Sequence, residues 1–435
     1  MTSWHRSESR GTRTAPARRK RSFSLGSVRS DARIPRLAAV ATLCLVASSI
    51  GSRSAHAQET TRPERDISDS LAESHKEAEN GETEQPGTRW TLLPQIGYDP
   101  ETSINAGVKL RNNDLLSSGY FIDLNGVVSL RRREEASLSL GNPHIWNDRL
   151  LAFFNLYGLY DDSREFFGIG DNDVGPDPVS NHNIRRINAA WTMGSKFLDN
   201  SLALNLGFTL RWTKVSRGQS HDTPSTQDLF PDLPGIHGGW SNEFAISAVY
   251  TNRESVERPT RGWLLTGKGA WVPSVLGNDF NYWRVTGDAS YLFPLLTRRQ
   301  ILGTRLSAES LFGPTDRIPF YELASLGGAD NLRGFFPQRF LGKGKVFGNA
   351  EYRLKLFDFW FYNFWEVMID GVAFVDAGRV FVNYDDLKDN ILDHYKWDYG
   401  GGLRIAFSSG EVARIDVAIS HENQPNLFLT FGHTF

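Results

Sequence analysis

The chain has 435 residues and a formal net charge of −2, and it is rich in glycine and aromatic residues, with 40 Gly, 28 Phe, 13 Tyr and 12 Trp. Its mean hydropathy is −0.38, and no segment after residue 57 has the roughly 18 consecutive apolar residues of a spanning helix. These features argue against membrane-spanning helices after residue 57. They are typical of a transmembrane β-barrel, in which only every second residue of a strand faces lipid. On composition alone, a soluble β-rich protein is the alternative.

Residues 1–57 are predicted to be an export signal. Ten Lys and Arg residues lie within residues 1–36, an apolar run covers 37–50, and Ala55 and Ala57 form a small-x-small cleavage site. The single cysteine, Cys44, follows Leu43, where a lipoprotein signal has a small residue, so we expect no lipid anchor. Cleavage after Ala57 would leave a net charge of −11 and no thiol. That balance disfavours nucleic acid as a partner and leaves no disulfide framework.

Residues 58–88 are expected to form a disordered periplasmic tail. This segment has nine acidic residues, three basic residues and no aromatic residue. Such a composition cannot bury enough apolar surface to offset the entropy of ordering the chain.

Residues 89–435 are expected to form one transmembrane β-barrel. Apolar and polar residues alternate with period two, as between Leu202 and Trp212. A soluble sandwich would show the same alternation, but the export signal favours a barrel. We predict an all-β fold of sixteen antiparallel strands at residues 90–98, 103–111, 119–130, 135–141, 149–160, 183–196, 201–213, 240–251, 263–271, 282–293, 301–311, 346–357, 366–378, 397–408, 412–421 and 426–435. An even count places both ends in the periplasm, and the long connections 161–182, 214–238, 313–345 and 379–396 outside.

The connection between predicted strands 11 and 12 contains the most distinctive motif. Five glycines between Tyr321 and Val346 surround the sequence Leu332-Arg333-Gly334-Phe335. Glycine at this density allows tight backbone folding, so the Arg and the aromatic residues can be held in defined positions. An ordinary surface loop with a solvated Arg is the alternative.

This motif resembles the Val/Leu-Arg-Gly-Phe/Tyr signature of the BamA/TamA superfamily of outer-membrane assembly and secretion barrels, the bacterial surface antigen domain. Two further segments of the chain match the family in order, Gly348–Arg353 and Phe374–Gly378. The resemblance implies that the loop folds into the barrel lumen. It also implies that Arg333 meets Asp376 and Glu351 on the inner wall, and that Phe374 and Gly378 belong to a strand motif.

The chain ends on an alternating strand in which Leu427, Leu429, Phe431, His433 and Phe435 share one face. A strand that ends in an aromatic residue resembles the signal by which the barrel-assembly machinery recognises its substrates. The resemblance therefore assigns Phe431, His433 and Phe435 to a C-terminal assembly signal, and it names that machinery as a partner during biogenesis.

No catalytic or cofactor motif is found. The sequence has no Gly-x-Ser-x-Gly elbow, phosphate loop or His-Glu-x-x-His, and its ten His do not cluster at ligand spacing. Asp171, Asp173 and Asp177 lie in a Gly-containing loop, but they do not complete an EF-hand, so a solvated acidic loop is favoured. We therefore predict a protein that is not an enzyme and that has no metal site and no cofactor.

The sequence as a whole predicts a protein of the Gram-negative outer membrane, in contact with its lipid. By resemblance, its function is insertion or translocation of proteins, or of another substrate, with a periplasmic partner or an exported protein as candidate partners. The 31-residue tail is too short for the periplasmic polypeptide-transport-associated modules of the family, which weakens this inference. The alternatives are a structural surface antigen, a passive pore, or the membrane half of a system whose other part is a separate chain.

Overall fold

The computed structural model describes residues 90–170, 175, 177–220, 223–254, 258–361, 365–385, 393–407, 412–422 and 425–431. All of them belong to the larger of two compact units of the chain, Leu43–Phe435. The predicted export signal with Ala55 and Ala57, the acidic tail, and His433 and Phe435 lie outside the described residues.

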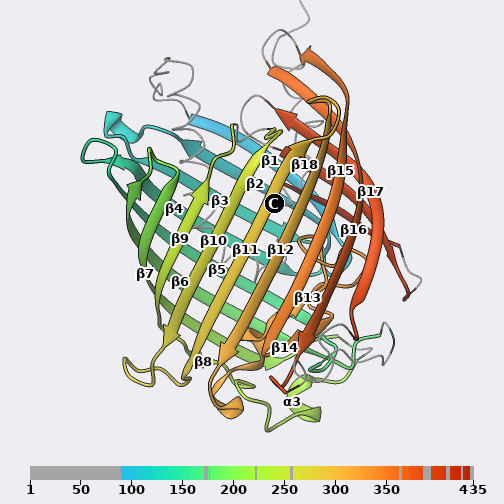
Figure 1. Cartoon of the computed structure of the whole chain (residues 1–435). Coiled ribbons are helices and arrows are strands. Elements are labelled where there is room, and N and C mark those ends of the chain that lie inside the picture. Colours follow the sequence, from blue (N-terminus) through green and yellow to red (C-terminus); the bar gives the residue numbers. More distant parts are fainter. Residues whose placement is uncertain are drawn as a thin grey trace, which may run out of the picture. The chain divides into compact units, whose positions relative to one another are not determined.

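Within the described residues, seventeen strands form one sheet, and one of them, β8 (Gly239–Trp240), has only two residues. The other sixteen form a closed antiparallel barrel (Figure 1). They are β1 (Trp90–Asp99), β2 (Ser103–Asn112), β3 (Phe121–Ser129), β4 (Arg133–Ile145), β5 (Leu150–Phe166), β6 (Ser180–Phe197), β7 (Leu202–Arg217), β9 (Glu243–Thr251), β10 (Gly262–Val272), β11 (Tyr282–Pro294), β12 (Gln300–Phe312), β15 (Gly344–Phe361), β16 (Trp365–Phe381), β17 (Lys396–Phe407), β18 (Val412–Ser420) and β19 (Asn426–Phe431). The predicted number and order of barrel strands are therefore confirmed.

The barrel closes between its first and last strands. β1 pairs with β2 from Trp90↔Asn112 to Asp99↔Ser103, and on its other side with β19 in the register Tyr98↔Leu429. Closure matters because an open edge in lipid would leave backbone N–H and C=O groups without partners, at several kcal/mol each.

The two faces of the strands are inverted relative to a soluble protein. In β7, the outward Leu204 and Leu206 are exposed, whereas Asn205 and Arg211 on the inner face are buried. The apolar face is thus the outer face, as a lipid environment requires. Among the described residues, no helix is long and apolar enough to cross a membrane.

Several predicted boundaries were wrong, because strands such as β4, β7 and β15 run two to four residues beyond their predicted ends. Residues 161–182 were expected to be a loop, but β5 continues to Phe166 and β6 begins at Ser180, with a register shift between Asp161 and Arg164. Charged residues can extend these strands because they are paired inside the barrel, as Arg164 is with Asp161 at 3.3 Å. The predicted strand 240–251 is interrupted before β9, where the Asn242 side chain accepts a hydrogen bond from the Arg211 N–H and donates one to Leu276 O.

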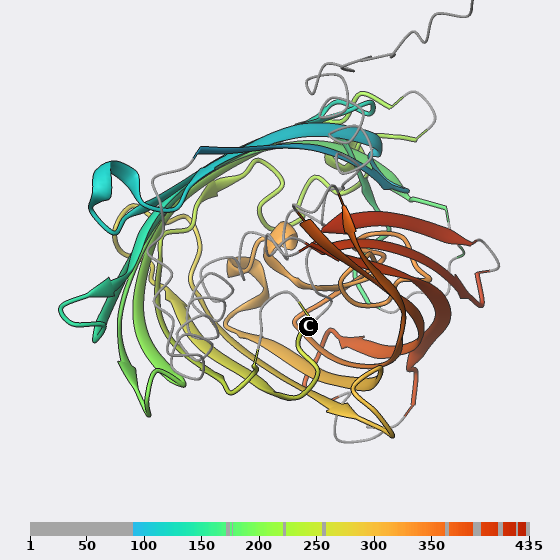
Figure 2. The same cartoon turned by 90° about the horizontal axis from the view of Figure 1, so that it is seen from above.

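The connection between β12 and β15 lies inside the ring of strands (Figure 2). It contains the 3-10 turns η2 (Thr315–Arg317) and η3 (Phe320–Glu322), and the short strands β13 (Ala324–Leu326) and β14 (Phe340–Gly342), which pair with each other. We call residues 313–343 the lumen loop. The connection between β7 and β9 contains the short helix α3 (Thr226–Leu229). This helix lies at the end of the barrel where β14 is found (Figure 1).

Candidate functional site: the lumen loop

Tight glycine turns give the lumen loop its path. Gly327 and Gly328 both have φ near +110°, in the region that favours glycine. The Asn331 side chain accepts hydrogen bonds from the N–H groups of Gly327 (2.6 Å) and Leu332 (2.7 Å). At Gly334, an added Cβ would lie 2.5 Å from the Asp398 Cβ of the barrel wall. The loop therefore approaches the wall so closely at this point that only glycine fits.

Arg333 inserts its side chain into the wall formed by β15 to β18. Its Nε and Nη2 donate to the two oxygens of Asp376 at 2.8 and 2.9 Å, and its Nη1 donates to Glu351 Oε2 at 3.1 Å. The guanidinium carbon lies 3.3 Å from the centroid of the Phe374 ring. Arg333, Asp376 and Glu351 are each 0% exposed. A bidentate, charge-assisted pair of this kind requires the planar fork of Arg, which Lys lacks.

The Arg333 pair is part of a larger buried network of alternating charges. Arg404 bridges Glu351 (2.8 Å) and Asp416 (2.7 Å). Arg414 donates to Asp416 (3.1 Å) and to two lumen-loop groups, Asp330 Oδ1 (3.2 Å) and Ala329 O (2.7 Å). The side chains of this network come from four adjacent strands and from the loop. We call Arg333, Arg353, Arg404, Arg414, Asp330, Glu351, Asp376 and Asp416 the Arg333 network.

We call the buried ion pairs of Arg333 the first anchor of the loop. In a second anchor, which the sequence reasoning missed, the loop supplies the anion and the barrel wall supplies the cations. Glu322 in η3 is fully buried and accepts hydrogen bonds from Arg186 Nη2 (2.9 Å), Arg284 Nη2 (2.8 Å) and Arg211 Nη1 (3.4 Å). These arginines belong to β6, β11 and β7. The only available signal was the presence of Arg at inward positions of alternating strands, such as Arg211 in β7.

The two anchors hold the lumen loop on two separate groups of strands. Glu322 binds β6, β7 and β11, whereas Arg333 binds β15 and β16. Because each anchor is a buried ion pair, neither half of the loop can leave the wall without stranding a buried charge. The loop therefore joins two parts of the barrel wall across the lumen.

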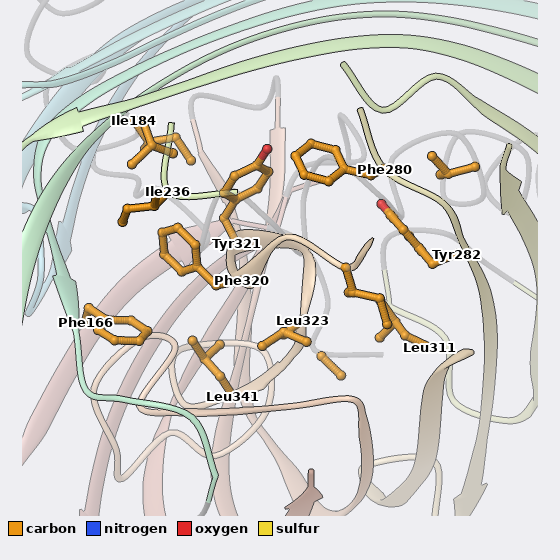
Figure 3. Packing of buried hydrophobic residues seen from close by; sticks show 14 of the residues in the cluster. Phe166, Ile184, Ile236, Phe280, Tyr282, Leu311, Phe320, Tyr321, Leu323 and Leu341 are labelled. Atoms are coloured by element: carbon orange, nitrogen blue, oxygen red, sulfur yellow. The ribbon is translucent and has the colours of Figure 1, made fainter. Parts of the chain in front are cut away.

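Apolar packing fills the space between the loop and the wall near the Glu322 anchor. Phe320 and Leu323 of the loop pack with wall residues such as Phe166, Ile184 and Leu311 (Figure 3). Near the other anchor, the cluster that contains Leu332 and Phe335 is formed by Leu326, Leu332, Phe335, Phe340, Phe347 and Val380. A barrel of this class usually has a polar interior, so these apolar clusters resemble the core of a small soluble domain placed inside it.

The other predicted site residues fall in different places. Phe374 lies under the Arg333 guanidinium, and Gly378 pairs with Phe347 near the loop. Phe431 is in β19, opposite Ala413, and its part in an assembly signal stays a prediction. Of the predicted acidic loop, Asp171 and Asp173 lie outside the described residues. Across the part of the chain that the structure describes, no group of three or more His, Cys, Asp or Glu side chains is placed to hold a metal ion.

Comparison with known proteins identifies the family. The model described as the Omp85 superfamily domain matches residues 114–435. The chain belongs to the Omp85 superfamily. Membership and the barrel fold place this Omp85 protein in the bacterial outer membrane.

Two solved structures are similar to this Omp85 barrel. One is BamA from Haemophilus ducreyi lacking POTRA domains 1-3, with a TM-score of 0.56, 17% identity, and coverage of 79% of this chain and 70% of that one. The other is CdiB from Escherichia coli, with a TM-score of 0.54, 14% identity, and coverage of 80% and 63%. At these identities the likeness shows the fold alone. The chain spans less than two thirds of the length of the CdiB structure.

Proposed function

We propose that this Omp85 barrel takes part in the insertion or translocation of proteins at the outer membrane. The observation that carries the proposal is the lumen loop, buried and held by opposite charges on two groups of strands. A passive pore needs an open lumen, whereas here a substrate could use the lumen only after the loop moves. Known members of the superfamily are assembly and transport factors, which supports a role of this class and disfavours an enzyme.

The seam between β1 and β19 is the proposed place of contact with a client protein. These two strands are the first and the last of the barrel, so no hairpin connects them, and their pairing depends on inter-strand hydrogen bonds. An extended segment of a client could add to either strand by β-augmentation, in which main-chain hydrogen bonds supply the affinity. Trp90 and Leu92 on β1 are exposed on the outer face beside this seam.

Site-specific photo-crosslinking in cells tests the proposal. A crosslinking amino acid at Leu92 should capture exported or outer-membrane proteins during their synthesis. The matched control is Leu206 on β7, which is equally exposed (63% and 66%) but far from the seam. Client adducts from Leu92 and none from Leu206 are expected, and equal adducts from both positions would contradict a role for the seam.

The competing function is a structural surface protein, which the rigid double anchoring of the loop would also suit. If the protein is structural, neither Leu92 nor Leu206 gives client adducts, and deletion of the protein leaves other outer-membrane proteins at normal levels. A pull-down with the full-length protein would identify a separate periplasmic chain if the barrel is the membrane half of a larger system.

A further inference from the structure

Two cationic side chains stand opposite each other on the outer surface of the barrel. Arg185 of β6 and Lys214 of β7 are direct cross-strand partners. Both are exposed, whereas their chain neighbours Ile184, Arg186 and Val215 are buried on the inner face. The alternation therefore directs this pair away from the lumen, toward the surroundings of the barrel.

The pair is electrostatically unfavourable by itself. Like charges directly opposite each other on neighbouring strands destabilise a sheet. Among the described residues, no ion pair joins Arg185 or Lys214 to a carboxylate, and the Arg185 guanidinium instead lies 4.9 Å from the centroid of the Tyr160 ring. Arg217, three residues beyond Lys214, does have such a partner, because it pairs with Asp228 at 2.7 Å. The Arg185–Lys214 pair thus presents two uncompensated positive charges at a defined place.

An apolar row lies directly beside the pair. Ile187, Trp212 and Trp240 occupy neighbouring positions on β6, β7 and β8, two residues further along from Arg185 and Lys214. Ile187 and Trp240 are exposed. Two residues of a strand correspond to ~6.7 Å, and aromatic rows of this kind mark the membrane interface of outer-membrane barrels. The two cations therefore lie at the level of lipid headgroups.

We propose that Arg185 and Lys214 bind the phosphate group of an anionic lipid in the outer leaflet. One phosphate between the two side chains would remove their repulsion, with the Arg fork donating two hydrogen bonds and the Lys acting as a point charge. The acyl chains of the same lipid would contact Ile187, Trp212 and Trp240. Free phosphate would lack this apolar contact, which is why a lipid is the occupant. The outer leaflet follows from the strand count, because this end of β6 and β7 faces away from the chain termini.

Lipid titration followed by native mass spectrometry tests this site. The full-length protein in uncharged detergent is titrated with diphosphorylated lipid A, with its dephosphorylated form and with inorganic phosphate. Because each cation near an anionic lipid surface contributes a factor of about five in affinity, the R185A/K214A variant should bind diphosphorylated lipid A about thirtyfold more weakly. R185K/K214R keeps both charges and should stay within a few-fold of the wild type.

The matched control is R298A/R299A, which removes two exposed cations from the turn between β11 and β12 at the opposite end of the barrel. It should bind the lipid as the wild type does. Should R185A/K214A not fold, as judged by heat-modifiable mobility on a gel, the single K214Q variant replaces it, with a fivefold loss expected. Unchanged lipid affinity in the folded variants, or displacement of the lipid by inorganic phosphate at equal concentration, would overturn the proposal.

Discussion

Arg333 and Asp376 form a fully buried bidentate ion pair that joins the lumen loop to β16, with N···O distances of 2.8 and 2.9 Å. Burial makes this pair costly to break, since removal of one partner leaves a desolvated charge without compensation. The geometry also explains why the motif needs Arg at this position. A Lys ammonium could not donate two parallel hydrogen bonds to the two carboxylate oxygens, as the planar guanidinium does.

A double-mutant cycle tests this relationship. Arg333→Ala and Asp376→Ala should each lower the free energy of unfolding by about 3 to 5 kcal/mol, because each leaves a buried charge. The double variant should cost less than the sum of the two single variants, since it leaves neither partner behind. Urea unfolding in detergent micelles measures all three values. Strict additivity would show that the two groups do not interact.

The second anchor, Glu322, predicts a similar loss of stability when its charge is removed. Glu322→Gln keeps the shape of the side chain but removes the charge that compensates Arg186, Arg211 and Arg284. It should destabilise the barrel by several kcal/mol and increase trypsin cleavage within the lumen loop in intact cells. The control is Asp316→Asn, since Asp316 is an exposed acid of the same loop and should have little effect. Equal behaviour of the two variants would show that Glu322 is not an anchor.

Closure of the barrel can be tested with cysteine pairs. Tyr98→Cys with Leu429→Cys places two thiols at partner positions of β1 and β19, and a Cys44→Ser background removes the only native thiol. A mild oxidant should crosslink this pair. Tyr98→Cys with Ile246→Cys on β9 should give none. A folded protein that fails to crosslink at the seam would contradict the closed barrel.

A buried carboxyl in the turn between β1 and β2 predicts a pH dependence. Burial, reinforced by the neighbouring Asp161 charge, raises the pKa of Glu101 to about 8. The folded state then retains a proton that the unfolded chain loses above its pKa of 4.5, so this contribution to stability is complete below pH 4.5 and is lost as the pH rises to 8. The melting temperature should fall more between pH 5 and 9 in the wild type than in Glu101→Gln. Parallel profiles would contradict the shifted pKa.

The sequence contained most of the fold because a barrel in lipid leaves a regular pattern. Alternation of the Leu202–Trp212 type identifies a strand and its outer face at once. Strand ends were less predictable. Where β5 and β6 extend beyond the predicted ends, the inner face bears charged residues such as Asp161 and Arg164. When only the sequence is known, charged residues of this kind indicate a loop rather than a strand.

The candidate site was only half predictable for a related reason. Arg333 belongs to a recognisable motif, so its contacts with Asp376 and Glu351 could be expected from the resemblance. Glu322 belongs to no motif, and its partner Arg186 lies 136 residues away along the chain. Nothing local in the sequence indicates that these two residues meet, because only the curvature of the whole barrel brings β6 to the loop.

Single-channel conductance in planar bilayers tests the central claim most directly, namely that the lumen loop closes the barrel and is held by charges on two groups of strands. The wild-type protein should give a low conductance with rare openings. The double variant R333A/E322Q, which loses both anchors, should show larger and longer openings in the same bilayers. A steady, large conductance in the wild type that the double variant leaves unchanged would contradict the account.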